Sequence, residues 1–445
     1  MYDPLIENKI PNNQPYPDSY WFHSAGDAPN SEGILKKDID VDVVIIGAGY
    51  TGLSCALHLA KDHGIKATVL EANGTAWGCS GRNAGFILNS SGRMSFQAME
   101  AKWGKSTMHQ ILGEMNEGVE RVNALIAQGI DCQPQTKGYI KIAHKASKFE
   151  LLKQQVGVHK ALFNKDVEVL TREQLHKHYM ADQNAYGAIR FSDGYGVHPL
   201  KLAWGYQELA QQQGVKIHTH SPVQHVEKQN GQVLLRTPSA NIKANKVIIA
   251  SNGYTPTGLH ALVHQKTLPV LSQIIVTEPL TKDQLAACNF YSSNVVMDTR
   301  ALKYYYRKLP DNRILFGGRG AITGEGAKDP YFANRLLKVL QSSFPALAQL
   351  NIDYAWSGWI CMSLDDIPHV YQDKEQQIFY SMGYCGSGVS FSVQAGKRLA
   401  DKVAEKEVPD IPIYNSELPT FPFAPLRRLG QWGYFQYGKF ADRYL

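Results

Sequence analysis

The sequence predicts a mixed α/β fold whose core is a dinucleotide-binding unit. An apolar strand runs into Gly47-x-Gly49-x-x-Gly52, a helical stretch follows, and a second strand ends at the acidic residue Glu71. Gly47 permits the tight turn, Gly49 lets the backbone approach a pyrophosphate, and Gly52 lets helix and strand pack closely. The pyrophosphate then lies at the positive end of the helix. Glu71, about 20 residues beyond the turn, is placed to accept hydrogen bonds from ribose hydroxyls.

The length, charge and cysteine pattern of the chain limit the class of protein to which it can belong. A chain of 445 residues is too long for one compact core, so we expect two closely joined domains. A formal net charge of +6 without a long Lys or Arg block argues against nucleic-acid binding. The six cysteines are scattered without a Cys-x-x-Cys pair, which is typical of a reduced, cytoplasmic protein without disulfides or a metal site. Lacking an apolar stretch of roughly 18 residues, the chain is expected to have no secretory signal and no transmembrane segment.

The remaining elements follow from hydrophobic periodicity, taken in chain order. Residues 1–36, rich in Pro, Asn, Asp and Ser, are predicted to form an extended arm anchored by Tyr20-Trp21-Phe22, and residues 37–72 form the βαβ unit. Apolar spacing predicts helices at 96–130 and 146–162, and His198-Pro199 introduces another at 200–213. A glycine-rich segment at 382–388 leads into a last helix ending near residue 405. Alternation predicts strands at 138–143, 215–220, 232–236, 246–250, 273–277, 303–307 and 313–318.

The nucleotide-binding domain is predicted to be discontinuous. The strands between 215 and 250 and the glycine-rich turn at 382–388 are also predicted to contact a nucleotide. A domain assembled from three separated pieces suits a large two-part cofactor. We therefore divide the chain into an N-terminal arm at 1–36, a cofactor-binding domain at 37–105, 180–260 and 360–410, a substrate domain at 106–179 and 261–359, and a C-terminal tail at 411–445.

A segment just after Glu71 carries a family resemblance. Gly78-Cys79-Ser80-Gly81-Arg82-Asn83-Ala84-Gly85 resembles the G-x-S-G-R-N-G-G segment of FAD-dependent amine oxidases of the D-amino-acid oxidase superfamily, above all those that act on γ-glutamylputrescine. The resemblance implies a glutathione-reductase-like Rossmann domain that binds FAD, joined to a substrate domain built on an antiparallel sheet. It continues in order through Asp193-Gly194, His198-Pro199, 248–254, 305–307, 311–318 and 386–389.

The resemblance also implies which residues hold FAD. The glycine turn holds the diphosphate, the acidic residue after the second strand holds the adenosine ribose, and Val223 touches the adenine. The G-x-S-G-R-N segment lies along the diphosphate and flavin, and the last glycine-rich turn closes over the pyrimidine edge. The full set is Gly47, Gly49, Tyr50, Thr51, Gly52, Glu71, Ala72, Ser80, Gly81, Arg82, Asn83, Val223, Ala250, Asn252, Gly253, Gly386, Gly388 and Val389.

Several positions depart from the family pattern. Ser387 stands where many relatives have His, and Ala84 replaces a glycine. Phe316 aligns with a lysine that promotes reaction with oxygen in sarcosine-oxidase relatives, which leaves O2 and another electron acceptor both open. Some relatives attach flavin through a cysteine near Cys361, but the spacing fits poorly, so we interpret Cys361 as a buried thiol.

Aromatic and basic residues in the second half of the chain are candidates for the substrate pocket. On the strand at 303–307, Tyr304 and Tyr306 share one face, and aromatic faces attract ammonium groups. Arg307, like Arg93 and Arg300, could pair with a substrate carboxylate. For each of these residues a packing or structural role is the alternative. We interpret His198 and His369 as turn residues, because each adjoins a proline.

The leading functional hypothesis is an FAD-dependent oxidase of an amine of the γ-glutamylputrescine type. Hydride transfer to flavin gives an imine, hydrolysis gives an aldehyde, and O2 is reduced to hydrogen peroxide. The segment Asp298-Thr299-Arg300 favours an alternative, the oxidation of a secondary amino acid such as pipecolate or sarcosine. A further alternative is a dehydrogenase that passes electrons to quinone while the basic and aromatic tail at 426–445 lies on a membrane; the same tail can instead pack on its own domain. A flavin-binding protein without catalysis completes the alternatives.

Overall fold

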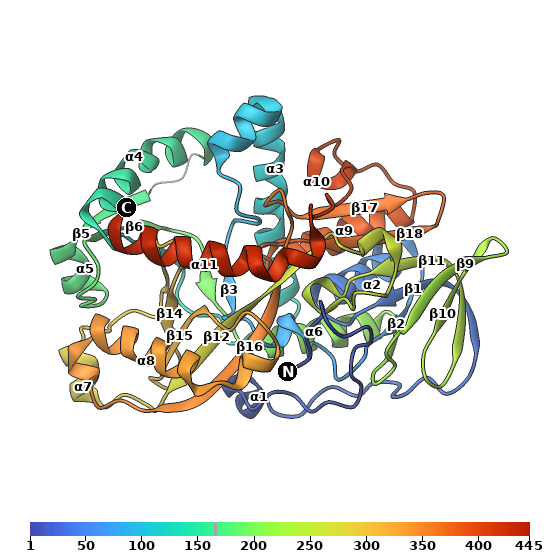
Figure 1. Cartoon of the computed structure of the whole chain (residues 1–445), viewed down its shortest axis with the longest axis horizontal. Coiled ribbons are helices and arrows are strands. Elements are labelled where there is room, and N and C mark those ends of the chain that lie inside the picture. Colours follow the sequence, from blue (N-terminus) through green and yellow to red (C-terminus); the bar gives the residue numbers. More distant parts are fainter. Residues whose placement is uncertain (164–166) are drawn as a thin grey trace.

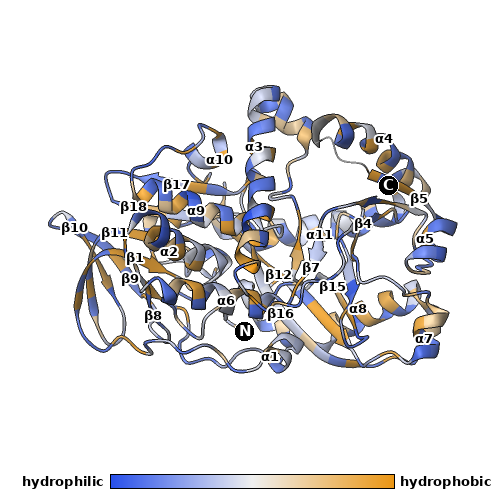
Figure 2. Cartoon of the chain, turned by 180° about the vertical axis from the view of Figure 1, so that it is seen from behind, coloured by the Kyte–Doolittle hydropathy of each residue, from blue (hydrophilic) through white to orange (hydrophobic). Residues whose placement is uncertain are grey.

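The computed structural model describes residues 1–163 and 167–445 and contains two large β-sheets, side by side in Figure 1. Figure 2 shows apolar strands inside both sheets and helices with hydrophilic outer faces. Two short strands, β3 (Phe86–Ile87) and β7 (Tyr195–Gly196), pair with each other and with neither of the two large sheets.

The first sheet has the order β17-β18-β11-β1-β2-β8, with a hairpin of β9 and β10 paired to β11. Its central strands run parallel, and only β17 and the hairpin are antiparallel to their neighbours. The strands come from three separated stretches of the chain. They are β1 (Ile39–Ile46), β2 (Thr68–Leu70), β8 (Lys216–His218), β9 (His225–Gln229), β10 (Gln232–Arg236), β11 (Asn241–Ile249), β17 (His369–Asp373) and β18 (Ile378–Met382).

Three helices pack together around this sheet: α2 (Tyr50–His63), α6 (Pro199–Gln212) and α9 (Phe391–Val403). The last half of strand β1 is apolar and is buried on both faces, as is typical of a central parallel strand. Helices α2 and α9 touch closely at Gly396, where a Cβ atom would lie 2.7 Å from the carbonyl oxygen of Thr51. The two helices that begin at the predicted glycine turns are thereby held against each other.

The second sheet has the order β16-β12-β15-β14-β13-β4-β6-β5 and is antiparallel except for the pair β4 and β13. Together the two sheets confirm the predicted fold class: a Rossmann-like parallel sheet joined to a largely antiparallel one. The strands are β4 (Tyr139–Ile142), β5 (Val167–Thr171), β6 (Gly187–Phe191), β12 (Leu268–Thr277), β13 (Val295–Asp298), β14 (Tyr305–Lys308), β15 (Ile314–Arg319) and β16 (Ile352–Met362).

Some elements differ from the sequence prediction. Strand β6 pairs in the second sheet, although our division at residue 180 placed it in the cofactor-binding domain, because a strand's pattern does not name its partner. The N-terminal arm contains a short helix, α1 (Tyr20–Ala25), whose Trp21 is buried and donates from Nε1 to the carbonyl of Asn83 at 2.9 Å. The long helix α3 (Phe96–Ile126) is interrupted at Gly104, which has a φ of +82°.

The remaining helices cover the second sheet and the ends of the chain. Helices α4, α5, α7 and α8 accompany the second sheet, α10 packs beside β17, and α11 runs along the outside of the molecule (Figure 1, red). Their bounds are α4 (Ala146–Phe163), α5 (Arg172–His178), α7 (Lys282–Ala287), α8 (Pro330–Ser343), α10 (Pro412–Asn415) and α11 (Arg427–Tyr444).

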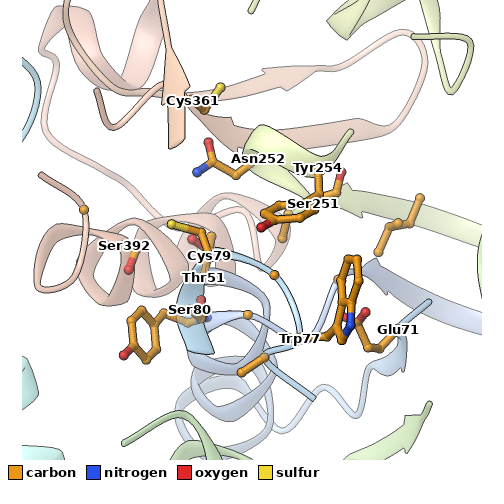
Figure 3. Close-up of a pocket in the computed structure, with 18 of the residues that line it drawn as sticks. Thr51, Glu71, Trp77, Cys79, Ser80, Ser251, Asn252, Tyr254, Cys361 and Ser392 are labelled. Carbon is orange, nitrogen blue, oxygen red and sulfur yellow. Dashed lines mark hydrogen bonds between the residues drawn. The ribbon is translucent and has the colours of Figure 1, made fainter. Parts of the chain in front are cut away.

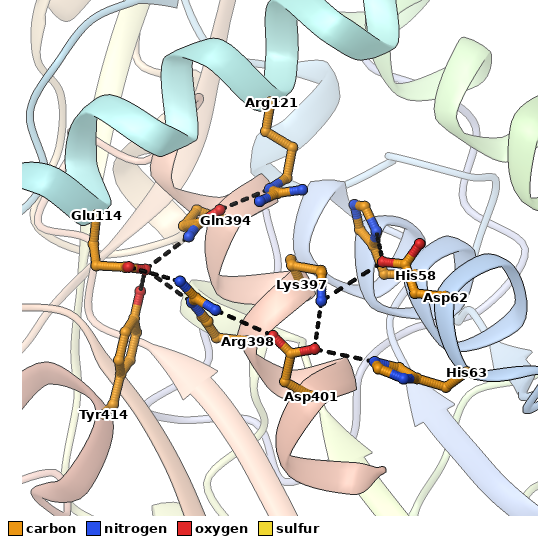
Figure 4. Close-up of polar contacts among 10 residues, drawn as sticks. All are labelled: His58, Asp62, His63, Glu114, Arg121, Gln394, Lys397, Arg398, Asp401 and Tyr414. Carbon is orange, nitrogen blue, oxygen red and sulfur yellow. Dashed lines mark hydrogen bonds and ion pairs between the residues drawn. The ribbon is translucent and has the colours of Figure 1, made fainter. Parts of the chain in front are cut away.

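A buried ion network ties the helices of the first sheet together (Figure 4). Glu114 of α3 accepts hydrogen bonds from Arg398 Nη2 of α9 at 2.7 Å, from Gln394 Nε2 at 2.7 Å and from Tyr414 Oη at 2.5 Å. Burial raises the pKa of the Glu114 carboxyl, but these hydrogen bonds outweigh it and lower the pKa. Arg398 also pairs with Asp401 one turn further along α9, and Asp401 in turn lies 3.0 Å from His63 of α2, so the network joins α3, α9 and α2.

Replacing Glu114 tests whether this network stabilises the fold. Glu114→Ala removes the carboxylate that compensates buried Arg398, and we expect it to reduce stability by about 3–5 kcal/mol and to lower the midpoint of thermal unfolding by several degrees. Glu117→Ala, at an exposed position of the same helix, should shift stability by less than about 0.5 kcal/mol. Equal midpoints for the two variants would contradict this role.

Candidate active site

A cavity of about 1180 Å³ opens at the end of the parallel strands of the first sheet (Figure 3). It is lined by the turn after β1, the segment after β2, the turn after β11 and the segment that leads into α9. Ligands bind open α/β sheets at this edge, beyond the carboxyl ends of the strands. The location is therefore the one that the sequence motifs predicted for a dinucleotide.

The glycine turn brings the start of α2 to the edge of this cavity. Gly47 has a φ of +106°, and its N–H donates to the carbonyl of Leu70 at 2.8 Å, which ties the turn to β2. A Cβ atom on Gly52 would lie only 2.0 Å from the carbonyl oxygen of Gly47, so any larger residue would push the helix away from the turn. Gly49 has no side chain to cap α2, and the first N–H of the helix donates to Ser80 Oγ at 3.0 Å. The other N–H groups of the first turn and the helix dipole are available to a pyrophosphate.

Glu71 lies in the cavity wall at the end of β2. Its carboxylate accepts backbone N–H groups from Ala48 at 2.9 Å and from Asn73 at 3.0 Å. Burial raises the pKa of Glu71, while the backbone N–H groups oppose that shift by stabilising the carboxylate. The side chain therefore links the glycine turn to the segment after β2, and it faces the cavity where a ribose would lie.

Most of the predicted cofactor residues line this cavity. They are Gly47, Gly49, Tyr50, Thr51, Glu71, Ala72, Ser80, Asn83, Val223, Ala250, Asn252, Gly386, Gly388 and Val389. Gly52, Gly81 and Gly253 instead lie behind the lining, each in close contact with neighbouring backbone carbonyls. Lining residues outside our predicted set include Trp77, Tyr254, Ile360, Cys361 and Tyr384. Tyr384 falls within the glycine-rich turn, Tyr254 ends the family-matched segment 248–254, and Cys361 was considered as a flavin attachment point, whereas Trp77 and Ile360 carried no motif.

A second cavity of about 1100 Å³ adjoins the first and shares part of its wall. The shared residues are Cys79, Asn83, Ile360, Gly386, Gly388 and Val389. Arg82 lines this second cavity; its Nε donates to the carbonyl of Trp77 at 2.7 Å and its guanidinium lies over the Trp77 ring. A two-part cofactor in the first cavity would therefore present its far end to the second.

The second cavity is strongly basic. Arg93, Lys303 and Arg319 line it, and none of its described lining residues is Asp, Glu or His. Burial first, then the neighbouring cations Lys141, Arg93 and Arg319, lower the pKa of Lys303 to about 8. Burial and repulsion from Arg93 also lower the pKa of Arg319. The groups that act on the Arg319 guanidinium are Arg93, Tyr305, Tyr434 and Cys385, and in the described part of the chain no carboxylate pairs with it.

A third cavity of about 1430 Å³ continues from the second. The two share Leu88, Arg93, Met297 and Lys303, and the third adds Lys141 and Asp193. Burial lowers the pKa of Lys141. The second and third cavities therefore adjoin, and cations outnumber acidic residues in their combined lining.

The tyrosines of β14 alternate as expected, but the one that lines the second cavity is Tyr305. Its hydroxyl lies 2.6 Å from Ser272 Oγ. Tyr306 points into the core on the other side, where its hydroxyl donates to Asp182 Oδ2 at 2.7 Å, and Tyr304 packs against Phe316. The alternation of side chains along a strand predicts which residues share a face, but it does not predict which face lines the cavity.

The arginine candidates also separate in the structure. Arg307 is fully buried, donates to Gln135 Oε1 at 2.7 Å and to the carbonyl of Val197 at 2.6 Å, and lies outside the cavity linings described above. Arg300 is paired with Asp298. Arg93 does line the second and third cavities, where its Nη2 donates to Tyr434 Oη at 2.6 Å.

Other residues from the sequence analysis lie away from the basic cavity. His198 caps α6 through the N–H of Lys201 at 3.2 Å, and His369 bonds the carbonyl of Ser416 at 2.9 Å. Phe316 is in the core beside Tyr306, so it does not occupy a position beside the cofactor cavity. Cys361 lines the cofactor cavity, and burial raises the pKa of its thiol to about 12.

Across residues 1–163 and 167–445, no group of three or more His, Cys, Asp or Glu side chains is placed to hold a metal ion. Within the same ranges, every helix is too short or too polar to cross a bilayer.

The chain matches the DAO family model, described as FAD dependent oxidoreductase, over residues 42–402. The protein belongs to this family. The family confirms both the resemblance and FAD as the cofactor, and the turn, helix N-terminus and carboxylate of the first cavity fit that group. FAD would be held between α2 and the segment before α9, with its reactive end toward the basic cavity.

Individual relatives agree with this assignment. Gamma-glutamylputrescine oxidoreductase of Escherichia coli (strain K12) is 32% identical over 369 residues, which cover 82% of this chain and 84% of that protein. Probable oxidoreductase OrdL of Haemophilus influenzae (strain ATCC 51907 / DSM 11121 / KW20 / Rd) is 29% identical over 86% of this chain and 88% of that protein. The solved structure of L-amino acid deaminase from Proteus vulgaris has a similar fold, with a TM-score of 0.70 at 17% identity over 86% of this chain and 98% of that chain.

Exchanging Glu71 for Gln tests the cofactor cavity. The amide would turn an NH2 group toward one of the two backbone N–H groups that the carboxylate now accepts, and it would remove a charged acceptor from the ribose site. We expect FAD to bind at least about tenfold more weakly, measured as the flavin content of the purified protein and by titration of the apoprotein. Asp40→Asn, at an exposed position of β1, is the control and should retain flavin. Full flavin content in the Glu71 variant would remove the assignment.

Proposed function

We propose that the protein oxidises a C–N bond of an amine that also carries a carboxylate, a substrate of the γ-glutamylputrescine type. FAD accepts the electrons, the imine product hydrolyses to an aldehyde, and O2 is reduced to hydrogen peroxide. Oxidation of CH–NH groups is the reaction class of this family, and the E. coli relative supports the finer choice of substrate.

The observation that carries the proposal is the basic cavity beside the flavin site. Arg93, Lys303 and Arg319 face it without an acidic lining residue in the described chain. Such a cavity repels a polyamine that is positively charged at both ends and attracts a molecule with a carboxylate. Arg binds carboxylates through two parallel N–H groups, and the absence of an acidic partner leaves Arg319 available. An amine with a carboxylate at its other end satisfies both conditions.

The cations also prepare the amine for oxidation. Hydride transfer requires a neutral amine, and both desolvation and neighbouring positive charges lower the pKa of an ammonium group. The described lining residues of the second cavity offer no carboxylate or imidazole as a base, so the proton leaves to water. Tyr305, with its hydroxyl fixed by Ser272, adds a rigid aromatic ring to the lining of the same cavity. Helix α9 begins beside the wall that the two cavities share, where its positive end favours negative charge.

The same cations favour one second candidate, a secondary amino acid such as pipecolate or sarcosine, whose carboxylate adjoins the reacting carbon. The presence of the third cavity beside the second favours the larger γ-glutamylputrescine, because a small amino acid would leave the third cavity unused. Anaerobic reduction of the bound flavin by γ-glutamylputrescine, putrescine, sarcosine and pipecolate separates them. We expect γ-glutamylputrescine to bleach the flavin fastest and putrescine to be much slower. Bleaching by amino acids alone would select the second candidate.

Replacing Arg319 tests carboxylate recognition. Arg319→Gln removes a charge-assisted, bidentate contact, and we expect the KM for the carboxylated amine to rise about 10- to 100-fold. The KM for an amine without a carboxylate should change little or fall. Arg236→Gln, on the exposed surface of β10, is the control with unchanged kinetics. An equal loss for both kinds of amine would show that Arg319 does not read the carboxylate.

The pKa of Lys303 gives a pH dependence. Protonated Lys303 attracts the carboxylate, and this attraction is complete below about pH 8 and disappears as Lys303 loses its proton above that value. We therefore expect kcat/KM, which reports the free enzyme, to fall above about pH 8. Lys303→Arg should keep the activity and remove this decline, because guanidinium stays charged. Persistence of the decline in Lys303→Arg would assign it to another group.

A further inference from the structure

The C-terminal helix α11 presents a continuous apolar face to solvent. Large apolar side chains recur at helical spacing, and each is more than half exposed. Figure 1 shows the helix along the outside of the molecule. The exposed residues are Leu426, Leu429, Trp432, Tyr437, Phe440, Tyr444 and Leu445, and Phe423 just before them is exposed to 81%.

This face is exposed although the helix itself is firmly attached. On the opposite side Phe435 and Gly438 are buried, and Gly438 lies against Leu302. Asp442 accepts backbone N–H groups from Ala301 at 2.6 Å and Leu302 at 3.1 Å. One face of the helix therefore packs on the protein and the other is left exposed. The first face fits the interpretation that the tail packs on its own domain, and the second is open to a membrane.

The exposed charged side chains of α11 are all positive. Lys439 and Arg443 are exposed beside it, whereas Asp442, the one acidic residue between 418 and 445, points inward to the second sheet. A helix with Trp, Tyr, Phe and Leu on one side and Lys and Arg at its border lies in the plane of a membrane surface. Anionic lipid headgroups complement its charge.

We propose that the exposed face of α11 docks the protein on an anionic membrane surface. A second copy of the chain is the less favourable occupant. A two-fold contact through this face would place Lys439 and Arg443 of both copies in one interface, where no acidic side chain of the exposed face could pair with them. The proposal does not rest on the identity of the amine substrate.

The side of α11 that packs on the protein lies next to the basic cavity. Tyr434 of α11 bonds Arg93, a lining residue of that cavity, and Leu302, which contacts Gly438, stands between the lining residues Ala301 and Lys303. Docking through α11 would therefore bring the wall of the substrate cavity close to the lipid headgroups.

Vesicle flotation of the full-length, FAD-loaded protein tests the proposal. We expect the protein to float with vesicles of phosphatidylcholine and phosphatidylglycerol and to bind pure phosphatidylcholine vesicles several-fold more weakly, with binding reduced by salt. Trp432→Ser with Phe440→Ser should weaken the partition at least about tenfold while flavin content is kept. The matched control, Tyr291→Ser with Tyr331→Ser, removes two equally exposed aromatic side chains elsewhere and should bind like the unaltered protein.

Two outcomes would overturn the proposal. One is failure of the unaltered protein to float, and the other is equal flotation of the α11 double variant and its control. A dimer in solution that the α11 variant dissociates, without vesicle binding by the unaltered protein, would assign the face to a second copy instead. Because flotation needs no substrate, these outcomes are independent of the proposed reaction.

Discussion

The close approach of α2 to the end of β1 is the constraint on which the rest of the site depends. It is possible because Gly52 has no side chain to strike the carbonyl of Gly47. The approach directs the free N–H groups of α2 into the cofactor cavity and places Ala48 where Glu71 holds it. Since Gly396 packs α9 against α2 just as closely, the position of the turn before α9 follows from the same contact.

The two sheets contribute to different cavities. The first sheet ends in groups that suit the phosphates and ribose of FAD, while the second contributes Tyr305 and Arg319 from the neighbouring strands β14 and β15. The cavities meet at Gly386, Gly388 and Val389, which belong to the segment leading into α9. A substrate bound by the second sheet would thereby be presented to a cofactor bound by the first. The ion network around Glu114 stabilises the helices at this junction.

The sequence predicted the cofactor site better than the substrate site, for a physical reason. A pyrophosphate is bound by backbone, which demands glycines at fixed spacing, and Gly47, Gly49 and Glu71 could be recognised from spacing alone. The substrate cavity is assembled from side chains of separate strands, loops and helices, whose pairing no local pattern states. Tyr305 was assigned to the opposite face from its neighbours but not to the cavity, and Arg319 was overlooked because it lies within an ordinary strand. The strands β5, β9 and β13 escaped prediction because they are short and half exposed or lack alternation.

The central claim is that FAD and a substrate carboxylate meet at the boundary between the two cavities. The most direct measurement is a crystal structure of the FAD-bound protein with an unreactive amide analogue of the carboxylated amine. We predict that the carboxylate pairs with Arg319 or Lys303 and that the amide nitrogen end lies against the flavin, near Gly386 and Gly388. A carboxylate outside the basic cavity, or flavin bound away from the glycine turn, would contradict the account.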